Sequence, residues 1–211
     1  MKEHTFTVGR ITFNTQLVLL IIVTTIVPML DVYKRHILDV NAYNRFIFYF
    51  VIPIAIILLV FRESPREFGL RLGNWKEGLL WTIAVCILIG AFLYGFARTD
   101  AMQSYYAARA ADTAGAIIFR NMVELFAWEF VWRGFLLFGL ARHVGIGPAI
   151  WLQAVPFAYM HLGKPELETL STIFGGAGFG FVAWRTQSFL YGWLIHWFMA
   201  AFTVLIAAGF L

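Results

Sequence analysis

Long apolar runs dominate the chain and constrain its fold more than any other feature. Seven of them cover residues 12–30, 44–61, 78–97, 116–141, 147–163, 167–184 and 188–210. A helix needs about 20 apolar residues to cross the hydrocarbon core of a bilayer, and most of these runs reach or approach that length. We therefore predict an all-α, polytopic transmembrane helix bundle of about seven spans, in which the short fifth run is tilted or partly re-entrant.

The overall composition also indicates a membrane protein. Of the 211 residues, 61% are hydrophobic and 13% are charged, whereas a soluble domain has about 45–50% and about 25%. No linker divides the chain, so we expect a single integral membrane domain over residues 1–211, and its compactness suggests a prokaryotic cytoplasmic membrane. The 16 basic residues are scattered, which indicates contact with a lipid bilayer and no nucleic acid. The single cysteine, Cys86, excludes an internal disulfide and a Cys-rich metal site.

Two connections and one glycine pattern add detail to this bundle. Residues 62–78 hold four basic residues and a proline, and we expect a surface connection there. Residues 98–115 are rich in alanine with scattered charge, and they predict a short interfacial helix. Gly176 and Gly180 follow the small-xxx-small pattern, which predicts that two helices pack closely.

Four charged residues lie within the fourth apolar run: Arg120, Glu124, Glu129 and Arg133. Residues four apart share one stripe of a helix, so Arg120 is expected beside Glu124, and Glu129 beside Arg133. The two pairs are expected on opposite faces, with the first pair at the headgroups and Glu129 deeper. A carboxylate inside the membrane is costly unless it is paired or faces a wet cavity. The Glu129–Arg133 pair is therefore either a structural ion pair or part of a functional site.

Two histidines in later runs can join this glutamate. His161 lies at the last turn of the fifth run, and His196 lies inside the seventh. Because successive spans alternate in direction, the start of the fourth run and the ends of the fifth and seventh share one half of the membrane. Glu129, His161 and His196 can therefore approach one another. Such a group supports either a general base acting on water or a zinc ion held by all three side chains.

These positions resemble a known family, the CPBP family of CAAX-type intramembrane endopeptidases and their bacteriocin-processing relatives. The similar motifs are Glu129-x3-Arg133-Gly134, Phe157-x3-His161, and His196 in the final span. The resemblance covers about residues 116–205. It implies a helix bundle around a water-filled cavity, in which the glutamate and first histidine activate water, the last histidine stabilises the oxyanion, and no metal is needed. The chain departs from the family pattern at Trp128, where a first glutamate is usual, and at Ala200, where an asparagine is usual.

The resulting hypothesis is a glutamic-type intramembrane endopeptidase that cleaves a membrane protein or peptide. By resemblance, Glu129 is the general base, His161 its partner on the water, His196 the oxyanion donor and Arg133 the residue that orients Glu129. No cofactor is expected. The alternative for the chemistry is a zinc site at Glu129, His161 and His196. The alternative for the function is a non-catalytic CPBP-like membrane binding protein with an immunity or regulatory role, which Trp128 and Ala200 favour.

Overall fold

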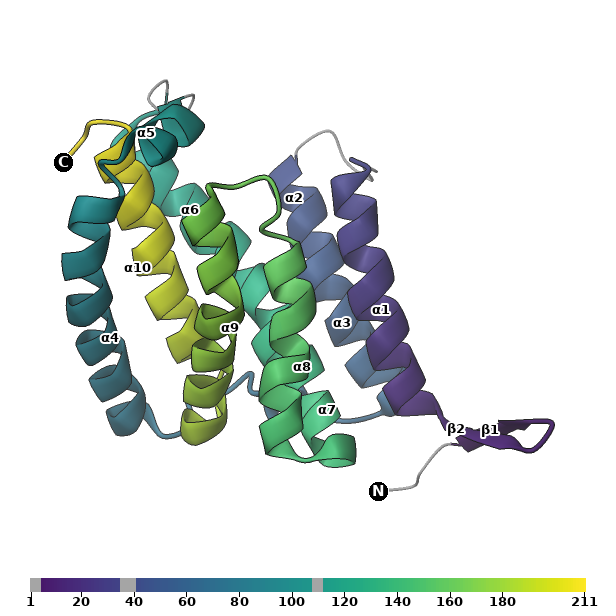
Figure 1. Ribbon diagram of the computed structural model, residues 1–211. Coiled ribbons are helices and arrows are strands. Elements are labelled where there is room, and N and C mark those ends of the chain that lie inside the picture. Colours follow the sequence, from purple (N-terminus) through teal and green to yellow (C-terminus); the bar gives the residue numbers. More distant parts are fainter. Residues whose placement is uncertain (1–4, 35–40, 108–111) are drawn as a thin grey trace.

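The computed structural model describes residues 5–34, 41–107 and 112–211 (Figure 1). Within these ranges the chain consists of helices joined by turns and loops, together with a two-stranded antiparallel sheet, β1 (Thr5–Val8) and β2 (Ile11–Asn14). The α-helices are α1 (Thr15–Val32), α2 (Asn41–Phe46), α3 (Ile52–Ala55), α4 (Trp75–Phe96), α5 (Asp100–Tyr106), α6 (Ala114–Glu129), α7 (Leu137–Val144), α8 (Ile146–Tyr159), α9 (Glu166–Thr186) and α10 (Leu190–Ala207). Wider π-helical turns cover Ile47–Val51, Ile56–Phe61 and Phe130–Leu136, and a 3-10 turn covers Pro65–Phe68.

The long helices lie side by side as one bundle (Figure 1). Residues 41–61 form one continuous rod through α2, α3 and their π-helical turns, and residues 114–144 form another through α6 and α7. Pro53 lies between the two π-helical turns of the first rod. A proline has no N–H to bond the carbonyl one turn earlier, which is a physical reason for the wider turns at this place.

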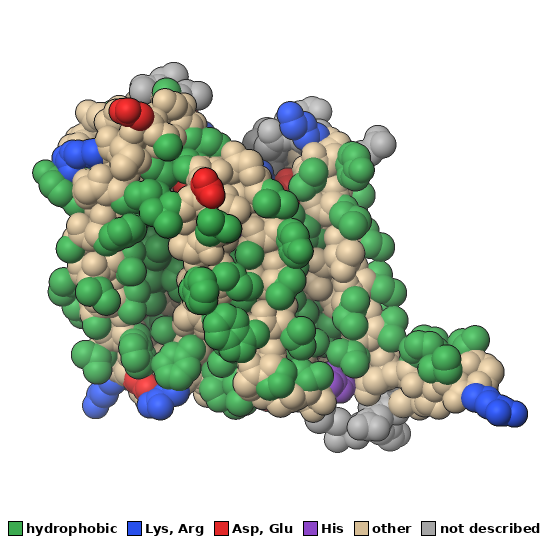
Figure 2. All heavy atoms as spheres, viewed as in Figure 1, with side chains coloured by type: hydrophobic (Ala, Val, Ile, Leu, Met, Phe, Trp, Pro, Cys, Tyr) green, Lys and Arg blue, Asp and Glu red, His purple; other side chains and the backbone are tan. Residues whose placement is uncertain are grey.

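Four helical segments are long and apolar enough to cross a membrane: Thr15–Val32, Tyr43–Phe61, Trp75–Phe96 and Leu190–Ala207. Figure 2 agrees, because hydrophobic side chains cover the visible flank while charged groups gather near the two ends. The prediction of an all-α membrane bundle is confirmed at this level. The number of seven spans is not confirmed, since the rod at 114–144 contains five charged residues and α8 has only 14 residues.

Glycines let α8 and α9 pack closely, as the sequence pattern predicts. A Cβ atom added to Gly176 would lie 2.9 Å from the Phe157 side chain. One added to Gly180 would lie 2.7 Å from the amide nitrogen of Gln153. A larger side chain at either position would therefore push the two helices apart.

The first apolar run begins differently from the prediction. Residues 11–14 belong to β2, and α1 begins at Thr15. The local signal was the alternation of apolar and polar residues on both sides of Gly9, whose φ of +63° suits a tight turn between strands.

The connection at residues 62–78 is not only a surface segment, and the prediction was wrong in this respect. Phe68 is fully buried, with its ring 6.1 Å from that of Phe61 and 6.2 Å from that of Phe135. The Arg142 guanidinium lies 4.6 Å above the Phe68 ring. An aromatic side chain thus anchors this connection inside one end of the bundle.

The connection at residues 98–115 is helical in part, as expected. It contains α5 (Asp100–Tyr106). Residues 108–111 of the same connection lie outside the described residues. The hydroxyl of Tyr106 donates to the Glu168 carboxylate at 3.1 Å, which ties α5 to α9. The placement of this helix at a membrane interface stays a prediction.

We predict that Gly73→Ala lowers the unfolding temperature in detergent more than Gly145→Ala does. Both glycines have positive φ, +55° and +78°, so both variants carry a backbone cost of about 1–3 kcal/mol. Only at Gly73 would the new Cβ also collide with a carbonyl, that of Thr186, at 1.9 Å. Equal losses of stability in thermal scans would contradict the close approach at this connection.

Candidate active site

A buried ion pair lies at the centre of the bundle. Glu129 and Arg133 are both completely buried, and Arg133 Nη1 donates to Glu129 Oε1 at 2.9 Å. Arg133 Nη2 also donates to the Gly176 carbonyl at 3.3 Å. The guanidinium carbon lies 3.9 Å from the Phe157 ring centre, so an aromatic face covers the cation. The i,i+4 pair expected from the sequence is present.

His196 is the second partner of this carboxylate. Its Nδ1 lies 2.7 Å from Glu129 Oε1. A carboxylate accepts hydrogen bonds, so Nδ1 carries the proton in this contact and Nε2 is left for other partners. The second carboxylate oxygen, Oε2, is buried and has no hydrogen-bond partner among the described residues.

Two tryptophans hold α10 in the register that brings His196 to Glu129. Trp193 donates from Nε1 to the Met122 carbonyl at 3.0 Å, and Trp197 donates to the Ile118 carbonyl at 3.0 Å. Both acceptors are backbone atoms of α6, one turn apart. The aromatic residues on either side of His196 in the sequence therefore fix the helix that carries it.

His161 follows α8 and is oriented by its own helix end. Its Nδ1 donates to the Phe157 carbonyl at 2.8 Å, which accounts for the Phe-x3-His spacing. Its ring centre lies 6.5 Å from that of His196 and 6.4 Å from that of Trp128. The His161 side chain is buried. Because Nδ1 is used by the Phe157 carbonyl, Nε2 is the ring nitrogen that is left for other partners.

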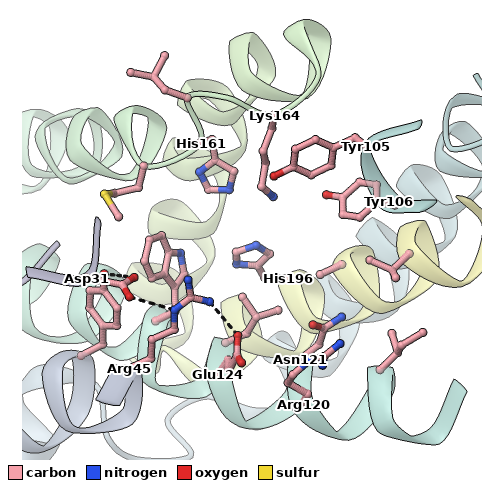
Figure 3. Close-up of a pocket in the computed structure, with 18 residues that line it drawn as sticks. Asp31, Arg45, Tyr105, Tyr106, Arg120, Asn121, Glu124, His161, Lys164 and His196 are labelled. Atoms are coloured by element: carbon pink, nitrogen blue, oxygen red, sulfur yellow. Dashed lines mark hydrogen bonds and ion pairs between the residues drawn. The ribbon is translucent and has the colours of Figure 1, made fainter. Parts of the chain in front are cut away.

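A polar cavity of about 490 Å³ opens in front of these histidines (Figure 3). Its wall includes His161, His196 and Trp128. The polar side chains around them come from α1, α2 and the π-helical turn after it, α5, α6 and the α8–α9 turn. These polar residues are Asp31, Arg45, Tyr49, Tyr105, Tyr106, Arg120, Asn121, Glu124 and Lys164. Glu129 does not line the cavity, so its charge reaches the cavity through His196.

An apolar crevice of about 300 Å³ adjoins the polar cavity. It runs along α4, α9 and α10, where Phe92, Leu167 and Gly175 are among its walls. The two spaces share His161, His196, Ala200, Tyr106 and Lys164. Both histidines therefore stand where a polar space meets an apolar one.

Arg120 and Glu124 do not pair with each other, contrary to the expectation. Arg120 Nη2 lies 2.6 Å from Asp112 Oδ2, and Glu124 Oε2 lies 3.1 Å from Arg45 Nη1. Arg45 also binds Asp31 at 3.2 Å, which links three helices beside the cavity. Sequence reasoning missed Arg45 and Asp31, since no local pattern tells which distant helix supplies a partner.

The zinc alternative requires Glu129, His161 and His196 to surround one ion. Within the described parts of the chain, no three or more His, Cys, Asp or Glu side chains form a group that could hold a metal ion. The side chains as arranged here therefore do not surround a shared ion.

Comparison with known proteins adds an independent finding. Residues 110–202 match the family model described as Rce1-like, type II CAAX prenyl endopeptidase Rce1-like. No curated protein and no solved structure matches the chain. The matched segment contains Glu129, Arg133, His161 and His196, and it agrees with the resemblance over residues 116–205. Residues 110–202 of this membrane protein therefore match a domain model of the CPBP family of CAAX protease-like proteins, of the Rce1-like type.

Proposed function

We propose that the chain is an intramembrane endopeptidase that hydrolyses a peptide bond of a membrane-associated protein or peptide. The observation that carries this proposal is the 2.7 Å contact between the Glu129 carboxylate and His196 Nδ1, inside the segment that matches the family model. A base oriented by a buried carboxylate is a recurrent device for activating a nucleophile.

In this proposal His196 removes the proton from the attacking water, and Glu129 acts behind it. The carboxylate keeps the proton on Nδ1, so Nε2 presents its lone pair to the cavity, and it stabilises the imidazolium that forms. His161 Nε2 accepts the second hydrogen of the same water and so directs the oxygen toward the scissile carbonyl. His196 then returns its proton to the departing amine, which leaves an amine and a carboxylic acid, and the acid releases its remaining proton to water.

This assignment moves the direct base from Glu129 to His196. Resemblance alone would give the glutamate direct contact with water. Complete burial of Glu129 supports the indirect role, because general-base catalysis requires hydrogen-bond reach to the proton that is removed. Arg133 is a positioning residue here, since it binds the carboxylate oxygen that also receives His196.

A specific observation favours a second candidate, a non-catalytic binding or regulatory protein. Trp128 and Ala200 line the cavity and present an indole and a methyl group, where the family pattern has an ionisable group and an amide. In that case the same cavity would hold a membrane peptide without cutting it. The buried charge cluster would then serve to keep the cavity walls in place.

We predict that the Glu129→Gln variant does not generate the new protein termini that the wild-type chain generates in host membranes. Glutamine keeps the shape but not the charge that orients His196, so cleavage should fall roughly 10²-fold or more. Comparative terminomics at matched protein levels measures this effect. Glu67→Gln is the control, because Glu67 is exposed and does not line either cavity. If wild type and Glu129→Gln give identical termini while both are folded, the binding function replaces the enzymatic one.

We predict that Gly175→Leu blocks the site from the apolar side. Gly175 lines the crevice, and a Cβ added there meets nothing within 4 Å, so leucine can fill the crevice without disturbing α9. The readout is the cleavage rate, or cross-linking to the partner if nothing is cleaved. Gly178→Leu is the matched control on the same helix, since its Cβ is equally free and it lines neither space. Full activity of Gly175→Leu would exclude the crevice as a substrate path.

A further inference from the structure

The β1–β2 hairpin has one apolar face and one polar face. Cross-strand partners lie on the same face, and the register pairs Phe6 with Phe13 and Val8 with Ile11. The intervening pairs, Thr5 with Asn14 and Thr7 with Thr12, lie on the opposite face. The side chains agree with this division, because the two phenylalanine rings stack at 5.1 Å and the two threonine hydroxyls lie 3.2 Å apart.

The apolar face is open to the surroundings. Phe6, Val8 and Ile11 are 44%, 63% and 62% exposed. A two-stranded hairpin is marginally stable in water unless its hydrophobic face packs against something. Something outside the described chain is therefore needed to cover these residues.

The position of the hairpin indicates what covers this face. β2 ends at Asn14, whose side chain caps α1 by accepting from the Leu17 amide at 3.1 Å. Since α1 is long and apolar enough to cross a membrane, its first residue marks a boundary between lipid and water. The hairpin thus begins at the membrane surface.

Polar contacts hold this junction at the end of the bundle. Gln16 donates to Glu63 at 3.2 Å and lies 3.2 Å from His143 Nε2, and Arg142 binds the other Glu63 oxygen. The hairpin itself projects sideways from α1, away from the other helices (Figure 1). In Figure 2 its hydrophobic side chains lie on the side turned toward the apolar flank of the bundle, and a basic side chain lies at its tip.

We propose that this hairpin lies flat in the membrane interface and binds lipid. Its apolar face, Phe6, Val8, Ile11 and Phe13, contacts acyl chains, and its threonine face contacts headgroups and water. Arg10, in the turn, reaches the lipid phosphates, in the way that basic and aromatic residues anchor other interfacial elements. The strand edges keep unpaired backbone groups, which the hydrated interface can satisfy and the hydrocarbon core cannot.

Lipid is favoured over a second protein chain because the apolar face of the hairpin continues into the exposed apolar surface of α1. The first turns of α1 expose Ile21, Ile22 and Ile26, which are 54%, 44% and 48% exposed. In a membrane span these side chains face acyl chains. An adjoining apolar face at the boundary of that span is covered by the same bilayer without a further partner.

Single-cysteine labelling tests this placement. The parent is the full chain with Cys86→Ala. One variant adds Val8→Cys, and its matched control adds Thr7→Cys, which is the neighbouring residue on the opposite face. Each new thiol is labelled with an environment-sensitive fluorophore. The protein is placed in nanodiscs of phosphatidylcholine and phosphatidylglycerol, with or without doxyl-labelled lipid. We expect blue-shifted emission and at least threefold stronger doxyl quenching at position 8 than at position 7. Ile11→Cys against Thr12→Cys should repeat the contrast on the other strand.

Two outcomes would overturn the proposal. Weak, equal quenching at all four positions means that both faces are in water. A blue shift at positions 8 and 11 without doxyl quenching means that a protein, such as a second copy of the chain, covers the face. Thermal scans of each variant against the Cys86→Ala parent identify any variant that has unfolded. Because each strand carries its own matched pair, the comparison between the two faces can still be made if one variant unfolds.

Discussion

Two full charges, a carboxylate and a guanidinium, lie inside an apolar bundle, and each requires partners, which its own rod and the neighbouring helices supply. Removing a partner from such a buried pair typically costs about 3–5 kcal/mol, because an uncompensated charge remains. Glu129 receives Arg133 from its own rod and His196 from α10, and Arg133 also reaches the Gly176 carbonyl on α9. The charge cluster therefore restricts how α6, α9 and α10 can be placed against one another, and the glycines at the α8–α9 contact permit that arrangement.

The same cluster determines what the cavity can do. A completely buried carboxylate cannot touch a substrate, but it can set the tautomer and orientation of the imidazole in front of it. His196 is thus the group through which buried charge acts on the cavity. Trp128 forms part of the cavity wall, with its ring 4.9 Å from Tyr49 and 5.6 Å from Trp132. The two imidazoles therefore lie at the junction of polar and apolar space.

The two ends of the bundle differ in construction. At one end, α2, α5 and the α8–α9 turn contribute polar residues to the cavity. At the other end, Phe68 is inserted between the helices, and the hairpin extends sideways from α1 (Figure 1). A lipid-bound hairpin at the Phe68 end would fix the tilt and depth of α1. The end that holds the cavity would remain free to admit a peptide, since the hairpin does not line the cavity.

The sequence by itself determined which segments are helical and apolar, because hydrophobicity and helical period are local properties. It also determined the Glu129–Arg133 pair, which needs only the helical spacing of four residues. The shared half of the membrane for Glu129, His161 and His196 stays a prediction. The family match covers residues 110–202, which contain these residues. Tertiary structure alone decided that Glu129 lies behind the cavity wall, that Arg45 rather than Arg120 binds Glu124, and that Phe68 is buried. These outcomes depend on which helices become neighbours and how far each is rotated about its axis, and no single helix encodes the rotation of the one beside it.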